Sequence, residues 1–181
     1  MQLVFDTCTP RPEVLQGQLT EDIFAARLKD VLDGAAAPVY QNPTTFFENT
    51  YPTAGLRLLL TEALGRLTGV RPASSPILRL ETAFGGGKTH ALIAMYHQTQ
   101  AWNAKQVVIV GTALGPQHTL WGLIEQQLTG SIARCTGQVS PGKETIRNLL
   151  CEHQPLVILM DEVLEYATKA AGVRVGSSDL A

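Results

Sequence analysis

The pattern of apolar and polar residues changes part way along the chain. In the N-terminal part, apolar residues recur at three- and four-residue steps, which is typical of helices that bury one face. This pattern predicts a helix from about Thr20 to Asp33, stopped by Gly34, and a second helix from about residue 54 to 68. Residues 4–18 are rich in Thr, Pro and Gly and are expected to form an extended arm.

From residue 76 onward, the apolar residues gather in short continuous runs. Such runs occur at residues 76–80, 106–111 and 156–160. Runs of this length suit parallel strands that are covered on both faces. The segments between them have helical spacing.

Helix signals separate these runs. Thr119 and Ser140 are candidate N-caps for two of the intervening helices, and a short helix is expected after Glu162. Strands that alternate with helices predict an α/β fold with a doubly wound parallel sheet sandwiched by helices. We expect this core over residues 76–181, preceded by an N-terminal arm and helical extension over residues 1–75.

A glycine turn joins the first predicted strand to a helix: Thr82-Ala83-Phe84-Gly85-Gly86-Gly87-Lys88-Thr89, followed by His90. Strand, glycine turn and helix form the phosphate-binding loop of P-loop NTPases, in which main-chain N–H groups face anionic oxygens. Lys88 would reach the phosphates of ATP, and the Thr89 hydroxyl would bind Mg²⁺. The match is imperfect, because Thr82 stands where the motif has its first glycine.

A second stretch keeps that first glycine but lacks the chemistry. Residues 137–144 read Gly-Gln-Val-Ser-Pro-Gly-Lys-Glu, which places Lys143 at the lysine position. Glu144 then replaces the Mg²⁺-binding hydroxyl, and no apolar strand enters the turn. We therefore interpret this stretch as a helix start and residues 82–89 as the phosphate loop.

The third apolar run ends in Asp161-Glu162, the Walker B pattern. The carboxyl ends of parallel strands face the ligand crevice, so both carboxylates would emerge near the phosphates. Asp161 would hold Mg²⁺, and Glu162 would orient or deprotonate the attacking water. About 70 residues separate Lys88 from Asp161, room for two crossover units of roughly 30 residues each. The alternative is a strand that ends in an exposed acidic turn.

Composition removes several classes of function. A formal net charge of −2 gives no sign of a nucleic-acid-binding surface. Three cysteines without C-x-x-C spacing predict reduced thiols and no zinc site. No signal peptide is evident, and no apolar run approaches the roughly 18 residues that span a bilayer. We expect a soluble cytoplasmic protein with no membrane contact.

The run from Leu80 to His90 resembles that of the large anti-phage-associated AAA-type ATP-binding proteins, the family of domain of unknown function 499. The stretches 4–11, 49–53, 120–122 and 159–162 are similar too. The resemblance covers nearly the whole chain, and in that family threonine also replaces the first glycine. It implies ATP and Mg²⁺ as ligands and a prokaryotic defence setting, with DNA or DNA-modifying proteins as partners. Members are several times longer, so we expect this chain to be the N-terminal part of an ATPase, with its core truncated after Walker B.

Other functions and residues stay open. The leading hypothesis is an ATP-hydrolysing domain that self-associates or belongs to a larger assembly. The first alternative is a nucleotide-gated interaction module with little or no turnover, and the second is a small-molecule kinase. Weaker candidates for contacts at the site are Glu81, His90, Thr112, Phe46, Phe47 and Tyr51, while Trp121 is expected in the core or at an interface.

Overall fold

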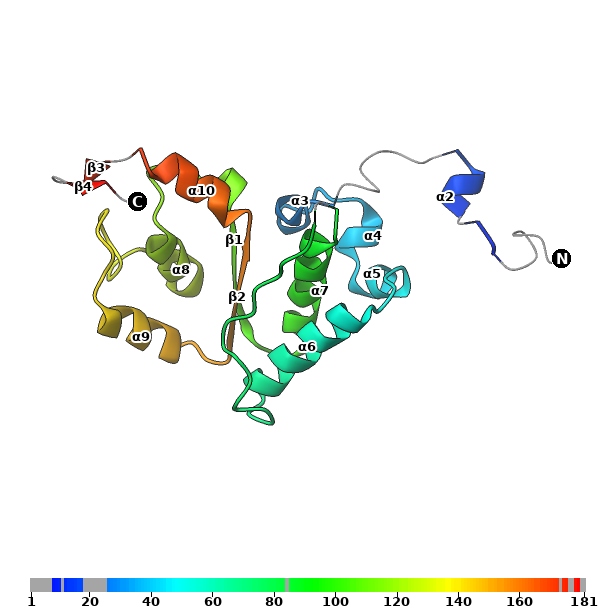
Figure 1. Ribbon diagram of the computed structural model, residues 1–181, viewed down its shortest axis with the longest axis horizontal. Coiled ribbons are helices and arrows are strands. Elements are labelled where there is room, and N and C mark those ends of the chain that lie inside the picture. Colours follow the sequence, from blue (N-terminus) through cyan, green and yellow to red (C-terminus); the bar gives the residue numbers. More distant parts are fainter. Residues whose placement is uncertain are drawn as a thin grey trace.

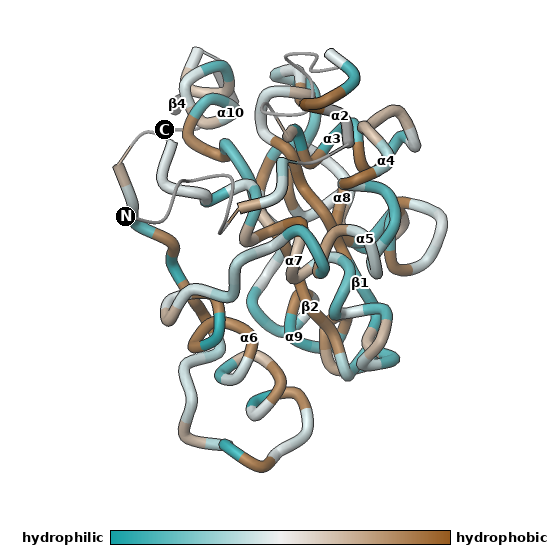
Figure 2. The backbone as a smooth tube through the Cα atoms, turned by 90° about the vertical axis from the view of Figure 1, so that its right-hand side faces the viewer, coloured by the Kyte–Doolittle hydropathy of each residue, from teal (hydrophilic) through white to brown (hydrophobic). Residues whose placement is uncertain are grey.

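A computed structural model describes residues 8–10, 12–17, 26–83, 85–172, 174–175 and 178–179. Two parallel strands, β1 (Lys105–Val110) and β2 (Leu156–Asp161), run through the middle of the molecule. Helices cover the sheet on both sides (Figure 1). Apolar stretches gather in this middle layer, where β2 and α7 lie (Figure 2). The chain is therefore a mixed α/β protein with a small parallel sheet.

The strand register brings the carboxyl ends of both strands together. Lys105 lies opposite Leu156, and Val110 lies opposite Asp161. Because side chains alternate along a strand, each face of the sheet has its own core. Val108, Val110 and Leu159 belong to one core, and Val107 and Ile109 belong to the other.

The first face is covered by α7 (Lys88–Ala101) and by the N-terminal helices. These are α3 (Leu28–Leu32), α4 (Pro38–Gln41), α5 (Pro43–Glu48) and α6 (Ala54–Leu67), and a short α2 (Pro12–Leu15) precedes them. Side chains cap two of the helices: Asn42 accepts from the Thr45 N–H, and Thr53 accepts from the Leu56 N–H. Phe46, only 1% exposed, anchors this core.

The second face is covered by the crossover from β1 to β2. This crossover contains η2 (Gly111–Ala113), α8 (Leu120–Thr129) and α9 (Lys143–Cys151). Ile124 and Leu149 are its buried contacts with the sheet. After β2 come α10 (Val163–Ala170) and an antiparallel pair, β3 (Arg174–Val175) and β4 (Ser178–Asp179).

The outer edge of β1 is closed by a side chain. The Gln127 amide on α8 accepts from the Val108 N–H (2.9 Å) and donates to the Val108 carbonyl (2.8 Å). The Gln127 amide thus supplies the acceptor and the donor that the main chain of a neighbouring strand would supply. Among the described residues, no main-chain hydrogen bond joins the outer edge of β2 to another segment.

Several sequence predictions are confirmed. The strands at 106–111 and 156–160 are found within one residue of the expected ends, and so is the helix at 54–68. Thr119 caps α8 by accepting from the Gly122 N–H. The helix after Glu162 is α10.

Other predictions are wrong. Residues 76–80 form no strand, and the Ile77 side chain is 80% exposed. Ser140 is not an N-cap, because α9 begins three residues later, after Gly142. The arm is not wholly extended, since it contains α2. The helix expected at 20–33 is shorter than predicted, because α3 begins only at Leu28, after an extended Arg27; residues 20–25 lie outside the described residues.

The failed strand has a physical reason. An extended segment becomes a strand only when neighbouring main chain supplies hydrogen bonds, and the segment before the glycine loop has none in the described structure.

No helix in the described ranges combines the length and hydropathy needed to cross a bilayer.

Candidate nucleotide-binding site

Glycines shape the turn that enters α7. Gly85 and Gly87 have left-handed φ values of 75° and 78°, which residues with a Cβ rarely adopt. Gly86 has a different constraint, because a Cβ built on it would lie 2.5 Å from the Thr82 hydroxyl oxygen. The main-chain conformation therefore favours glycine at positions 85 and 87, and at position 86 an added Cβ would also lie 2.6 Å from the Thr82 Cβ. Phe84 lies outside the described residues.

Lys88 ties the two ends of this loop together. Its ammonium group donates to the carbonyls of Thr82 (3.1 Å) and Ala83 (3.2 Å) and to the Thr82 hydroxyl (3.2 Å). These contacts hold the ammonium over the inner side of the turn. A positive charge in that position favours an anionic ligand.

The first turn of α7 offers main-chain donors beside the lysine. In the described structure, Ala91 is the first residue of the helix whose N–H has a main-chain acceptor, the Gly87 carbonyl. Among the described residues, the N–H groups of Thr89 and His90 have none. Together with the helix dipole, such unpaired donors favour phosphate or another anion.

Thr89 meets the end of β2. Its hydroxyl donates to an Asp161 carboxylate oxygen at 3.1 Å, although the two residues are 72 positions apart. Burial raises the pKa of the Asp161 carboxyl above its ordinary value, while the hydrogen bond from Thr89 opposes that shift. Hydroxyl and carboxylate oxygens are ligands that suit Mg²⁺. Nowhere in the described structure do three His, Cys, Asp or Glu side chains gather as a ready metal site.

Glu162 projects from a strained turn just after β2. It has a left-handed φ of 53°, which is uncommon for a residue other than glycine. Its carboxylate accepts a 2.7 Å hydrogen bond from the Thr112 hydroxyl, which follows β1. Lys169 donates to the Thr112 carbonyl (3.1 Å) and pairs with Glu165. The ends of both strands thus contribute to fixing Glu162.

Gly111 permits this approach of the two chains. A Cβ at Gly111 would lie 2.1 Å from the Glu162 carbonyl oxygen. No side chain fits in that space without moving the main chain. Only glycine allows the end of β1 to pass so close to the turn after β2.

The remaining candidates lie in varied surroundings. The Nε2 atom of His90 is 3.0 Å from the Thr50 hydroxyl, and its ring is 4.7 Å from the Phe46 ring, so its side chain packs on α5. Glu81 is exposed and pairs with Arg79. Tyr51 is exposed, while Trp121 packs against the second core. Phe46 is buried in the first core and not exposed at the glycine loop.

The rejected glycine stretch lies on the other side of the sheet. Lys143 is the exposed first residue of α9, which is preceded by irregular chain rather than by a strand. Gly137 has a left-handed φ of 83°, and its carbonyl accepts from the Trp121 indole. The structure gives this stretch no feature of a phosphate loop.

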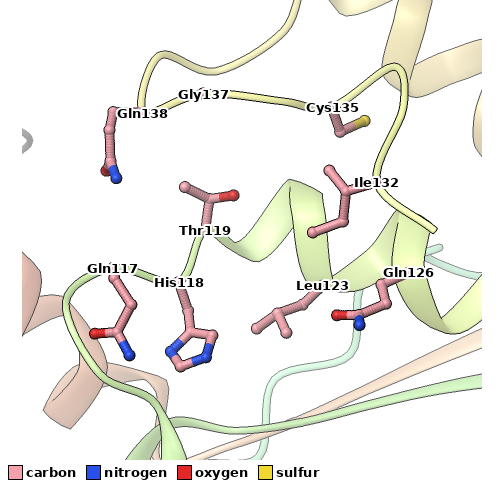
Figure 3. Close-up of a pocket in the computed structure, with 9 residues that line it drawn as sticks. All are labelled: Gln117, His118, Thr119, Leu123, Gln126, Ile132, Cys135, Gly137 and Gln138. Atoms are coloured by element: carbon pink, nitrogen blue, oxygen red, sulfur yellow. The ribbon is translucent and has the colours of Figure 1, made fainter.

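A separate hollow of about 190 Å³ lies between α8 and the loop after it (Figure 3). Its lining contains no Lys, Arg, Asp or Glu: Gln117, His118, Thr119, Leu123, Gln126, Ile132, Cys135, Gly137 and Gln138. It therefore has no charged group to hold a triphosphate. The glycine loop remains the candidate site.

Sequence reasoning missed the contacts that fix Glu162. Thr112 stands out as a polar residue after an apolar strand, but its partner depends on the order of strands in the sheet. Lys169 is four residues after Glu165, a spacing typical of helical ion pairs. That spacing reveals the Lys169–Glu165 ion pair but not the hydrogen bond from Lys169 to the Thr112 carbonyl.

The fold and site define an α/β protein with a glycine loop before a helix and paired carboxylates after a parallel strand. A family model described as the DUF499 N-terminal domain matches residues 4–113, more than half of the chain. The chain belongs to this family. The match includes the glycine loop, β1 and Thr112, whereas Asp161 and Glu162 lie beyond it. No curated protein and no solved structure matches the chain.

Proposed function

We propose that this chain is a P-loop, AAA-type domain that binds Mg²⁺-ATP and, in its working assembly, hydrolyses it. The observation that carries the proposal is the contact between Thr89 and Asp161 beside the lysine-closed loop. It joins a candidate phosphate site to a candidate Mg²⁺ ligand across 72 positions of sequence. An incidental glycine turn has no reason to meet a carboxylate in this way.

Each residue has a role in the proposal. Lys88 and the N–H groups of the loop and of α7 bind the phosphates. Thr89 and Asp161 hold Mg²⁺, which would neutralise developing charge on the phosphate oxygens. Glu162, oriented by Thr112, accepts a proton from the attacking water.

The test is ATP binding by the purified chain, measured by calorimetry with and without Mg²⁺. Lys88→Ala should abolish detectable binding and leave the fold intact, because in the described structure the hydrogen bonds of the Lys88 ammonium go to the loop and not to a core residue. Lys143→Ala is the matched control and should bind as the wild type does. Normal ATP binding by a folded Lys88→Ala protein would exclude the proposal, and loss in Lys143→Ala would point to the other glycine stretch.

A nucleotide-gated interaction module with little turnover is the second candidate. The observation that favours it is the unpaired segment before the loop, with Ile77 largely exposed. A loop whose leading segment is not held in a sheet is less preorganised for catalysis. We therefore expect this chain by itself to bind nucleotide weakly and to hydrolyse it very slowly.

The wider setting is proposed on family resemblance alone. It includes a role in prokaryotic antiviral defence, a cytoplasmic location, and DNA or DNA-modifying proteins as partners. The net charge of −2 offers no general attraction to DNA, so any such contact would need a local basic patch or another subunit.

A further inference from the structure

The three hydrogen bonds of the Lys88 ammonium are not equivalent. An ammonium group has three N–H donors, and Lys88 has three acceptors in the described structure. Two acceptors are main-chain carbonyls, which belong to the frame of the loop. The third is the hydroxyl of Thr82, a side chain that can rotate away.

The Thr82 side chain occupies the inner side of the turn. Its hydroxyl accepts from Lys88 at 3.2 Å and donates to the Ala83 carbonyl at 3.2 Å. It also lies so close to Gly86 that a Cβ there would be 2.5 Å from the hydroxyl oxygen. Thr82 is exposed, so this inward position does not serve the packing of a core.

We propose that the Thr82 hydroxyl takes the place of a phosphate oxygen on Lys88 while the loop is empty, and that phosphate must displace it. The inference rests on the proposed function and adds an affinity-setting residue to that site. The carbonyl contacts keep the ammonium near its working position. The hydroxyl satisfies the third donor until a ligand oxygen replaces it.

With threonine at position 82, phosphate binding costs free energy that it would not cost with the glycine of the usual motif. With glycine at position 82, the third donor of Lys88 would face water. With threonine, the ligand must break an existing charge-assisted hydrogen bond before it forms its own. Threonine therefore lowers affinity for phosphate and keeps the empty loop ordered.

The first experiment follows the Lys88 amine without any nucleotide. The protein is treated briefly with an amine-acylating reagent, and the labelling of each lysine is measured by mass spectrometry. Thr82→Val keeps the shape of threonine and removes the hydroxyl, so Lys88 should be labelled about two- to tenfold faster, the range for one lost hydrogen bond. Thr82→Ser should label like the wild type. Lys105 and Lys143 serve as internal controls and should not change.

The second experiment measures the affinity of the same variants for ATP and for inorganic tripolyphosphate. Thr82→Val and Thr82→Gly should bind both about two- to tenfold more tightly than the wild type, while Thr82→Ser should not. Circular dichroism verifies that each variant is folded.

The two experiments separate the possible failures. Weaker binding of ATP or tripolyphosphate by Thr82→Val would mean that the hydroxyl contacts the ligand. Unchanged labelling of Lys88 in Thr82→Val would mean that the hydroxyl does not hold the amine. Either result overturns the inference. If no variant binds ATP or tripolyphosphate while labelling changes as expected, the proposed function fails and the displacement by phosphate fails with it, although the Lys88 contact stands.

Discussion

Two adjacent carboxylates at the end of β2 lie in different surroundings, and this difference suits different tasks. Asp161 is half-buried and accepts from Thr89, and burial raises the pKa of its carboxyl. Glu162 is exposed and is held by Thr112. A cation bound at Asp161 would favour the charged form of that carboxyl. In the described structure the Thr112 hydroxyl binds one Glu162 carboxylate oxygen, Oε2, so the other could meet a water molecule.

The first residue-scale prediction separates these two roles. In an assembly that turns over ATP, Glu162→Gln should keep Mg²⁺-ATP bound and slow hydrolysis by about 10²–10⁴, since the amide cannot accept the proton. Asp161→Asn should instead weaken the dependence of ATP binding on Mg²⁺. Single-turnover hydrolysis and magnesium titrations measure the two effects. Normal hydrolysis by Glu162→Gln would place the base elsewhere, with Glu81 and Glu165 as the next residues to test.

A second prediction uses the close approach at Gly111. Gly111→Ala puts a Cβ 2.1 Å from the Glu162 carbonyl oxygen, so the main chain must move. We expect a loss of about 1–3 kcal/mol in the free energy of unfolding, typical of overpacking. Gly55→Ala on α6 is the control, because no atom lies within 4 Å of its added Cβ. It should be neutral or stabilising by up to about 1 kcal/mol. Equal urea midpoints for the two variants would contradict the geometry.

The third prediction concerns pH. Burial lowers the pKa of both His90 and His97. The Tyr40 carbonyl accepts a hydrogen bond from His97, which opposes the shift of that histidine only in part. A histidine whose pKa is lowered in the folded state takes up protons more readily when unfolded, so stability falls as pH drops below the unfolded value of 6.5. Urea midpoints should therefore decrease between pH 7.5 and pH 5.5.

His97→Gln should flatten this decrease, since it removes one of the two groups. Asp161, whose pKa is raised by burial, acts in the opposite direction, because acid relieves its buried charge. The comparison of wild type with His97→Gln isolates the histidine. An unchanged pH slope in His97→Gln would contradict the assignment.

At the scale of elements, the sequence predicts what local pattern determines. β1 and β2 are apolar on both faces, and the structure covers both faces of each strand. Residues 76–80 have a similar pattern but lack a strand partner, which no local pattern can reveal. The glycine loop and the carboxylates of β2 are readable as motifs. Their meeting through Thr89, and the hold of Thr112 on Glu162, depend on tertiary packing.

Glu125 on α8 is an element-scale feature that the sequence hides. It is 1% exposed and accepts from the main-chain N–H groups of Ala133, Arg134 and Cys135. Burial would raise the pKa of this carboxyl, but these donors and the Arg134 guanidinium lower it below its ordinary value. A single carboxylate therefore anchors the loop that follows α8.

Removal of this anchor gives the fourth prediction. Glu125→Ala leaves three main-chain donors without their acceptor, so we expect a loss of about 2–4 kcal/mol in the free energy of unfolding. Glu144→Ala on α9 is the control, because Glu144 is exposed and, among the described residues, forms one ion pair, with Arg147 at 3.6 Å. Its effect should stay within about 0.5 kcal/mol. Denaturant unfolding measures both, and similar losses would refute the anchoring role.

At the scale of the whole molecule, the two edges of the sheet differ. Gln127 closes the outer edge of β1. The Pro155 carbonyl, just before β2, accepts from the Lys105 N–H of β1. Alternate residues of a parallel strand bond to the same neighbour, so the main-chain N–H and C=O groups of Ile158 and Met160 point away from β1, toward the outer edge. That open edge has no lysine or proline to discourage pairing, and Met160 is 42% exposed. Natural sheets protect such edges, and unprotected ones recruit further strands.

We therefore expect the purified chain to associate through the outer edge of β2. A charge on an edge strand opposes pairing with another strand, so Met160→Lys should weaken association by about tenfold, which corresponds to about 1.4 kcal/mol. Leu164→Lys places the same charge on the exposed side of α10, away from the strand edge, and should have little effect. Sedimentation over a range of protein concentrations measures the association of each variant. If only Leu164→Lys restores the monomer, the contact lies on α10 and not on the edge of β2. If the wild type stays monomeric at high concentration, the β2 edge is protected in solution.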